Sequence, residues 1–240
     1  MHEISLRAEE IFQIGSFPVT NSLFLAVISA GLLILLSLIV RARIKMIPGK
    51  AQNFFEIIVE GVLDFMDSVL SSRAKSEKYF PLIATIFIFI TVSNWLGLMP
   101  IVGPFAAGYA RAPLLRAPAA DLNFTLILAV ISVFSVNFLG VLAIGFWKHF
   151  SKFFTFKSPI LSFVGLLELV SEFVKIISFS FRLFGNIFAG EVLLLVVGSL
   201  VPYFIPLPFL ALEVFVGFIQ AFIFSLLTLV FIGMAVQEQH

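Results

Sequence analysis

The chain has 240 residues, of which 60% are hydrophobic and 12% are charged, whereas soluble domains are about 45–50% apolar and about 25% charged. Because a water-soluble globule cannot bury so much apolar surface, the composition predicts an integral membrane protein. The net charge of +1 gives no general attraction to nucleic acid, and the absence of cysteine excludes disulfides and cysteine-based zinc sites. The three histidines are far apart and none has a metal-ligand spacing, so we expect no metal: His2, His149 and His240. We also expect no cofactor.

Residues 1–20 mix polar and apolar side chains and carry three acids. A signal peptide would begin with a basic stretch followed directly by an apolar run, so we interpret these residues as an outward-facing N-terminal tail or short helix. Residues 21–40 form an almost purely apolar run that is long enough to cross the hydrocarbon core. This run ends at Arg41, Arg43 and Lys45 and predicts the first membrane span.

The next segment, residues 52–70, alternates acidic and apolar side chains with a helical period. Its acids recur every three or four residues and so form one stripe: Glu56, Glu60, Asp64 and Asp67. This pattern predicts an amphipathic helix that lies on the membrane surface, with the stripe as a solvated face or a docking surface. We expect Arg73, Lys75 and Lys78 to close this helix.

The middle of the chain contains two further predicted spans, over residues 80–99 and 123–147. Between them, residues 100–122 contain four prolines and predict a loop, because proline interrupts helical hydrogen bonding. His149 lies just beyond the third span, and we interpret it as a loop residue at the membrane interface.

Two long helices are predicted at the end of the chain, over residues 159–200 and 206–237. The first would be roughly 60 Å long, about twice the hydrocarbon thickness, so it must tilt, kink or protrude. The expected fold is an all-α membrane protein with about five embedded helices, an amphipathic surface helix and a long, tilted C-terminal hairpin. We expect residues 1–240 to form one membrane domain, in which the spans of 21–147 precede the hairpin of 159–237.

The basic residues predict the orientation, because cytoplasmic connections are enriched in lysine and arginine. Ten of the fifteen fall in connections on one side of the predicted spans: Arg41, Arg43, Lys45, Lys50, Arg73, Lys75, Lys78, Lys148, Lys152 and Lys157. Three fall on the other side: Arg7, Arg111 and Arg116. We therefore expect the N-terminus outside and the C-terminus in the cytoplasm, with Arg111 and Arg116 as local exceptions.

Charged residues inside the C-terminal helices are functional candidates, because a charge in hydrocarbon needs protein, water or an ion as its partner. Arg182 has no acid three or four residues away and therefore no counter-ion on its own helical face. Lys175 differs, since Glu172 and Glu168 stand three and seven residues before it. Those three residues fit either a salt-bridged cluster near the cytoplasmic end or an exit route for an ion.

The two C-terminal helices are expected to run antiparallel. In such a pair, two residues that lie at the same depth have residue numbers whose sum is the same all along the helices. This rule places polar residues of the two helices side by side. If the turn is centred near Val201–Pro202, Arg182 lies level with Gln220, and Glu191 lies level with Glu213. Two carboxyls in one site of low dielectric do not both ionise easily, so at least one should hold or exchange a proton. This layout indicates a proton entry from the outer face.

Four segments then form a recognisable set: NWLGLMP (94–100), ADLNFTLILAV (120–130), FRLFGNIFAGE (181–191) and IQAFIFSLLTLVFIGMA (219–235). In this order and spacing they resemble subunit a of F-type ATP synthases, known as subunit 6 in mitochondria, and the likeness covers nearly the whole chain. The resemblance implies a stator subunit beside a rotating ring of c subunits, with b-type peripheral-stalk subunits as further partners. It also implies two half-channels that carry protons through the bilayer.

The resemblance implies roles for individual residues. The positions that match the proton path of the family are Arg182, Asn186, Glu191, Gln220, Glu213, Glu168 and Lys175. Arg182 matches the essential arginine, while Glu168 and Lys175 match polar positions of the cytoplasmic half-channel. Glu213 stands where bacterial relatives often carry histidine, so two glutamates replace the usual histidine–glutamate partnership.

The chemistry of arginine fits this resemblance independently. A guanidinium keeps its proton at accessible pH and favours the ionised form of any carboxylate brought near it. We therefore expect a rotor carboxyl to release its proton on approaching Arg182 and to take one up on leaving in either direction. The membrane potential supplies about 2.3 kcal/mol per charge per 100 mV for this cycle.

The expected function is proton translocation that couples to rotation and ATP synthesis. We expect the protein in a bacterial plasma (inner) membrane in preference to the mitochondrial inner membrane. The chain itself should be non-catalytic and bind no nucleotide, because it lacks a glycine-rich phosphate loop. One alternative is a self-contained, ion-coupled secondary transporter, which inverted repeats would favour, although no repeat is evident. A second alternative is a passive membrane anchor, which would tolerate a neutral residue at Arg182.

Overall fold

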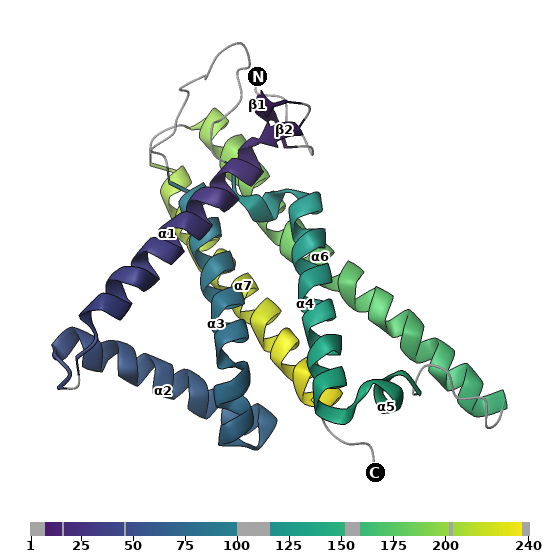
Figure 1. Cartoon of the computed structure of the whole chain (residues 1–240). Helices are drawn as coiled ribbons and strands as arrows, with labels where there is room; N and C mark the ends of the chain where they lie inside the picture. Colours follow the sequence, from purple (N-terminus) through teal and green to yellow (C-terminus); the bar gives the residue numbers. More distant parts are fainter. Residues whose placement is uncertain are drawn as a thin grey trace.

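The computed structural model describes residues 8–15, 17–45, 47–99, 116–151, 159–201 and 204–236. The chain forms one β-hairpin followed by helices (Figure 1). In chain order the elements are β1 (Glu10–Ile14), β2 (Phe17–Thr20), α1 (Asn21–Arg43), α2 (Lys50–Leu70), α3 (Arg73–Gly97), the short 3₁₀ helix η2 (Pro118–Ala120), α4 (Leu122–Ile144), α5 (Phe146–Ser151), α6 (Pro159–Leu200) and α7 (Pro206–Val236).

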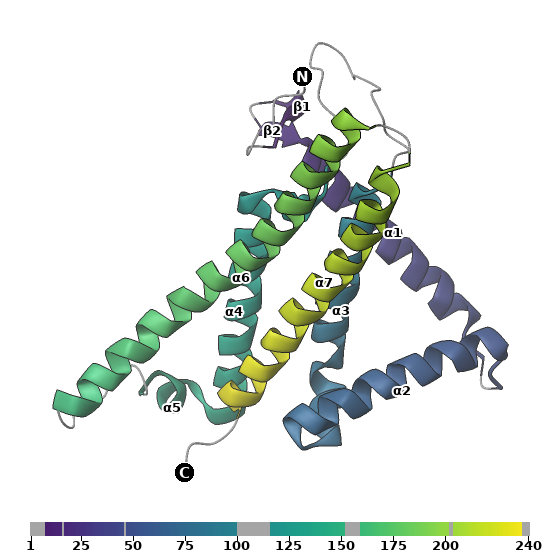
Figure 2. The same cartoon turned by 180° about the vertical axis from the view of Figure 1, so that it is seen from behind.

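Five of these helices, α1, α3, α4, α6 and α7, are long and apolar enough to cross a membrane. They run between the same two ends of the molecule, and the β-hairpin lies at the end opposite the last turn of α7 (Figures 1 and 2). Helix α2 lies across the other end, between the ends of α1 and α3. The predicted all-α membrane fold, with five embedded helices and an amphipathic helix beside them, is confirmed.

The N-terminal segment departs from the prediction of a tail or short helix. Its described part is an antiparallel hairpin in which Ile14 pairs with Phe17 and Glu10 pairs with Thr20. Gly15 has a φ of 65° in the turn, a conformation that glycine adopts at little cost. Bulky apolar residues on both sides of a glycine-containing turn are a hairpin signal, which outweighs the helical propensity of the acids.

The junction between α2 and α3 also differs from the prediction. Ser71 adopts a left-handed conformation with a φ of 53° and ends α2, where its N–H donates to the carbonyl of Asp67. Arg73, Lys75 and Lys78 therefore belong to the first turns of α3 and do not close α2. The Arg73 guanidinium contacts four carboxylates from both helices: Glu60 (2.7 Å), Asp64 (2.9 Å), Asp67 (3.1 Å) and Glu77 (3.3 Å). Most of the acidic stripe of α2 is thus an ion-pair network with α3.

The third span is shorter than predicted because Gly145 interrupts it. Gly145 has a φ of 89°, and such backbone is strained for residues that carry a Cβ. The chain leaves α4 at this residue and forms α5 as a separate short helix. The separation matters for His149, which α5 carries back toward α4.

Helices α6 and α7 form the predicted long hairpin, and both are inclined to the other spans (Figure 2). The rings of Phe179 and Phe224 lie 4.8 Å apart, which gives the antiparallel register expected for a turn near residue 201. The two helices diverge away from this turn. Helix α7 packs against α3, α4 and α6, and its buried side chains include Phe224, Leu229 and Ile232, so α7 forms the centre of the fold.

Candidate functional site

Arg182 lies near the middle of α6 and is exposed. Within the described parts of the chain, its guanidinium has a hydrogen bond to the Ser178 hydroxyl, from Nη2 to Oγ at 3.3 Å, and no carboxylate at ion-pair distance. The buried side of α6 is formed by other residues: Phe179, Ser180, Leu183, Ile187 and Gly190. The arginine therefore points away from the helices of its own chain.

The exposed side of α6 around Arg182 carries small and polar residues. Gly185, Asn186 and Ala189 are all exposed on it. A Cβ added at Gly185 would meet no atom within 4 Å, so this surface is open in the isolated chain. Small residues of this kind allow another helix in the membrane to approach closely.

A cavity of about 140 Å³ lies near the turn between α6 and α7. Its polar side chains are Asn94, Arg116, Glu191 and Glu213, which come from α3, the segment before η2, α6 and α7. A water molecule needs only about 10–15 Å³ of such volume and two to four polar partners. The cavity therefore has the size and the polar groups to hold several waters beside the two carboxyls.

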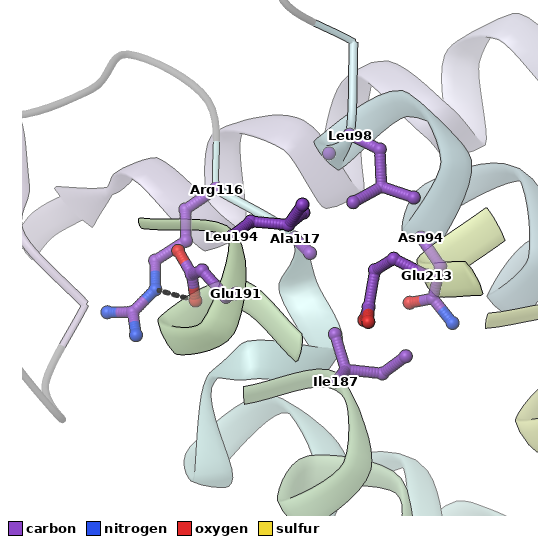
Figure 3. Close-up of a pocket in the computed structure, with 9 residues that line it drawn as sticks. Asn94, Leu98, Arg116, Ala117, Ile187, Glu191, Leu194 and Glu213 are labelled. Carbon is purple, nitrogen blue, oxygen red and sulfur yellow. Dashed lines mark hydrogen bonds and ion pairs between the residues drawn. The ribbon is translucent and has the colours of Figure 1, made fainter. Parts of the chain in front are cut away.

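The two carboxyls of this cavity differ in their partners (Figure 3). Arg116 is 6% exposed, and its Nε donates to the Glu191 carboxylate at 3.1 Å. Glu213 lies on the other side of the cavity, beside Asn94, and is 5% exposed. Its Oε1 is buried and has no hydrogen-bond partner among the residues that the structure describes.

Gly190 brings Glu213 close to α6. A Cβ added at Gly190 would overlap the Glu213 carboxyl group, so only glycine leaves room for it there. This contact places Glu213 level with the Gly190–Glu191 step of α6, as the sequence predicts. The two carboxyls therefore share one cavity, although one of them is paired with an arginine that the sequence analysis treated as a local exception.

A second polar cluster lies on the other side of Arg182, toward the beginning of α6. The Lys175 Nζ donates to Glu172 Oε1 at 2.7 Å and lies 4.6 Å from the centre of the Phe231 ring. Glu172 Oε2 accepts from the Asn137 amide at 2.9 Å, and the Asn137 Oδ1 lies 3.1 Å from His149 Nε2. The ion pair of Glu172 and Lys175 is one of the two interpretations that the sequence left open, and the sequence did not predict the connection of this pair to α4 and α5.

The remaining candidates are Glu168 and Gln220. Glu168 is partly exposed, one turn before Glu172 on α6. Gln220 is partly buried on α7 and makes no side-chain hydrogen bond within the described residues. No hydrogen bond joins Gln220 to Arg182 there, although the two residues lie at the predicted common depth.

Sequence reasoning missed four members of these clusters: Arg116, Asn94, Asn137 and His149. Asn94 and Asn137 are polar residues within apolar runs, and that contrast is the available signal, since a buried amide needs partners. His149 lies in helix α5 and is 1% exposed, so the prediction of a loop residue is wrong. The turn at Gly145 buries it, and no helical period extends across that turn.

Together these features define a multi-pass membrane protein that keeps ionisable side chains within its spans, an arrangement typical of proteins that move ions. Residues 23–233 match the family model described as ATP synthase A chain. The chain therefore belongs to the ATP synthase subunit a family, whose members are membrane subunits of that complex.

Similar bacterial proteins cover most of the chain. "ATP synthase subunit a 3" of Pelobacter propionicus is 36% identical over 211 residues, which are 87% of this chain and 84% of that protein. "ATP synthase subunit a" of Geotalea uraniireducens is also 36% identical over 211 residues, and the match covers 87% of this chain and 84% of that protein. "ATP synthase subunit a" of Helicobacter pylori is 35% identical over 231 residues, which are 94% of this chain and 96% of that protein.

Proposed function

We propose that the chain is the proton-conducting stator subunit of an F-type ATP synthase, with Arg182 facing a rotating ring of c subunits. The observation that carries the proposal is the outward direction of Arg182 on α6, without a carboxylate of the described residues beside it. A charge at this depth needs a partner. A carboxyl on a neighbouring subunit would supply one, and the small side chains around Arg182 leave space for its approach.

The cavity of Arg116, Glu191 and Glu213 is proposed as the outer half-channel. Glu191 lies nine residues beyond Arg182, or roughly 13 Å along the helix. The cavity is polar and has room for water. A proton that enters from the outer face would reach the two carboxyls first and pass from there, past Asn186 and Gln220, toward the ring.

The cluster around Lys175 and Glu172 is proposed to border the inner half-channel, together with Glu168. Lys175 precedes Arg182 by seven residues, or roughly 10 Å along the helix. The two polar clusters thus lie on opposite sides of the arginine along α6. A fixed guanidinium between them repels a proton on a direct path, so protons cross only while bound to carboxyls of the ring.

ATP chemistry in this proposal belongs to partner subunits, and the chain is a non-catalytic component that binds no nucleotide. It contacts the c-ring along α6 and a b-type peripheral stalk elsewhere. We place it in a bacterial inner membrane with the β-hairpin outside and the end of α7 in the cytoplasm. The distribution of basic residues supports that orientation.

The test is replacement of Arg182 by glutamine in the assembled complex. We expect ATP-driven proton pumping in inverted membrane vesicles to fall to the background of membranes that lack the complex, while the amount of assembled complex stays the same. Arg43→Gln is the matched control, since Arg43 is an exposed arginine in the last turn of α1. Its pumping rate should equal that of the wild type.

The same experiment separates the alternatives. Normal coupled pumping by Arg182→Gln would refute the stator mechanism and favour a passive anchor. Proton or solute transport by the purified chain, without the other subunits, would favour a self-contained secondary transporter.

A further inference from the structure

A continuous series of hydrogen bonds joins α5, α4 and α6 at the cluster around Lys175. It runs from His149 through Asn137 and Glu172 to Lys175, with heavy-atom distances of 3.1, 2.9 and 2.7 Å. Three separate helices thus meet through four polar side chains. Such a network in an apolar environment is stable only when each member has partners of the right kind.

The direction of each hydrogen bond in the series follows from the orientation of the Asn137 amide. The Asn137 Nδ2 donates to Glu172 and also to the carbonyl of Val133, at 3.0 Å, which uses both of its hydrogens. The Asn137 Oδ1 must then accept, so His149 Nε2 carries a hydrogen and donates it. The two acceptors of Nδ2 and the imidazole donor at Oδ1 thus favour the same orientation of the amide.

The backbone around His149 is built to bring its ring to Asn137. The positive φ of Gly145 turns the chain out of α4, and the His149 N–H donates to the Gly145 carbonyl at 3.0 Å within the new helix. A Cβ at Gly140 would lie 2.7 Å from the imidazole Cε1, so the ring packs directly on the backbone of α4. Gly145 therefore turns the chain toward Asn137, and Gly140 leaves room for the imidazole of His149 against α4.

We infer that His149 is a positioning residue for the inner half-channel. By donating to Asn137 it keeps the amide nitrogen on Glu172, and Glu172 in turn stays paired with Lys175. Without that donor the Asn137 amide loses one of the three hydrogen bonds that hold it, and its position on Glu172 becomes less well fixed. The inference rests on the proposed function, because it assigns Glu172 and Lys175 to the proton path.

The test compares two variants of similar size, His149→Met and His149→Gln, in the assembled complex. Methionine cannot donate a hydrogen bond, whereas the glutamine amide can. We expect His149→Met to lower the rate of ATP-driven proton pumping per assembled complex by about fivefold, the effect of losing roughly one hydrogen bond. His149→Gln should restore most of the rate. Trp147→Ala is the matched control on α5, since Trp147 is 85% exposed.

Asn137→Leu interrupts the same series at its centre and should cause a similar loss. The double variant with His149→Met should pump no more slowly than either single variant, because coupled residues are not additive. An unchanged rate in His149→Met, equal losses in the methionine and glutamine variants, or additive losses in the double variant would each overturn the inference. If His149→Met leaves too little complex to measure, a wild-type rate in Asn137→Leu would overturn it.

Measuring Arg182→Gln in the same membranes separates a failure of the proposed function from a failure of the positioning role of His149. If that variant still pumps, the proposed function fails. If it is inactive while His149→Met and Asn137→Leu both pump at the wild-type rate, only the role of His149 fails.

Discussion

At the scale of single residues, the outer cavity depends on how closely α6 and α7 approach each other. Glu213 reaches the backbone of α6 because Gly190 has no side chain. Arg116 then occupies the far side of Glu191. The two carboxyls thus come from different helices and line one cavity, and only Glu191 is paired with Arg116.

Gly190→Ala should disturb this arrangement. The added methyl group would overlap the Glu213 carboxyl, and overpacking of this kind typically costs about 1–3 kcal/mol. We expect less assembled complex in the membrane and slower proton pumping by what remains. Gly198→Ala on the same helix is the control, because a Cβ there would meet no atom within 4 Å. Equal yields and rates for both variants would show that Glu213 moves aside without consequence.

The depth of Glu191 and Glu213 follows from the sequence alone, since both helices are regular and the prolines beyond residue 201 fix the turn. The pairing of Arg116 does not follow. Arg116 comes after a proline-rich stretch of sequence, and no periodic pattern across such a stretch tells where its side chain lies. Asn94 and Asn137 are likewise recognisable as unusual in apolar runs, but their partners on other helices depend on packing.

At the scale of whole elements, α2 is attached to the bundle largely at one end. Met66 and Leu70 are buried near its C-terminus, whereas large apolar residues of its first half are exposed, such as Phe54, Phe55 and Ile57. The Arg73 network lies at the buried end. Exposed ion pairs contribute little singly, but four carboxylates around one guanidinium form a network.

Arg73→Gln should loosen this attachment. We expect faster hydrogen exchange in the last turns of α2 in the purified complex, with little change in α3. Because salt screens exposed charges, high ionic strength should have part of the same effect on the wild type. Lys75→Gln is the control, since Lys75 lies in the same turn and has no ion pair among the described residues. Unaltered exchange in Arg73→Gln would mean that apolar contacts alone hold α2.

The long helices were predictable because a span needs about 20 apolar residues, and such runs are plain in the sequence. The elements that were missed are short ones. The β-hairpin and α5 depend on Gly15 and Gly145, whose positive φ values redirect the chain. A glycine within an apolar run is compatible with continuing the helix or ending it, and tertiary packing decides between the two.

At the scale of the whole molecule, an odd number of candidate spans, five among the described residues, predicts that the β-hairpin and the last turn of α7 lie on opposite faces of the membrane. The chain contains no cysteine, so a single introduced cysteine can report its side without background. Glu10 in β1 and Lys50 in α2 are both exposed, and β1 and α2 lie at opposite ends of the molecule (Figure 1).

Glu10→Cys should react with a membrane-impermeant maleimide in intact cells, and Lys50→Cys should react only in inverted vesicles. This follows from the basic residues clustered at the end that holds α2. Labelling is measured by the mass shift of the chain, with each variant tested in both preparations. The reverse pattern would place the β-hairpin in the cytoplasm and contradict the proposed direction of proton entry.

The buried residues of α6 have a further mechanical consequence. Among the residues of α6 whose burial is described, all the buried ones except Gly165 lie between Phe179 and Gly190, at the level of Arg182 along the helix. If a turning neighbour pushes against the arginine, the sideways force enters α6 at the same level where α4 and α7 support it. The helix then experiences little bending moment, and the torque passes into the bundle without a long lever arm.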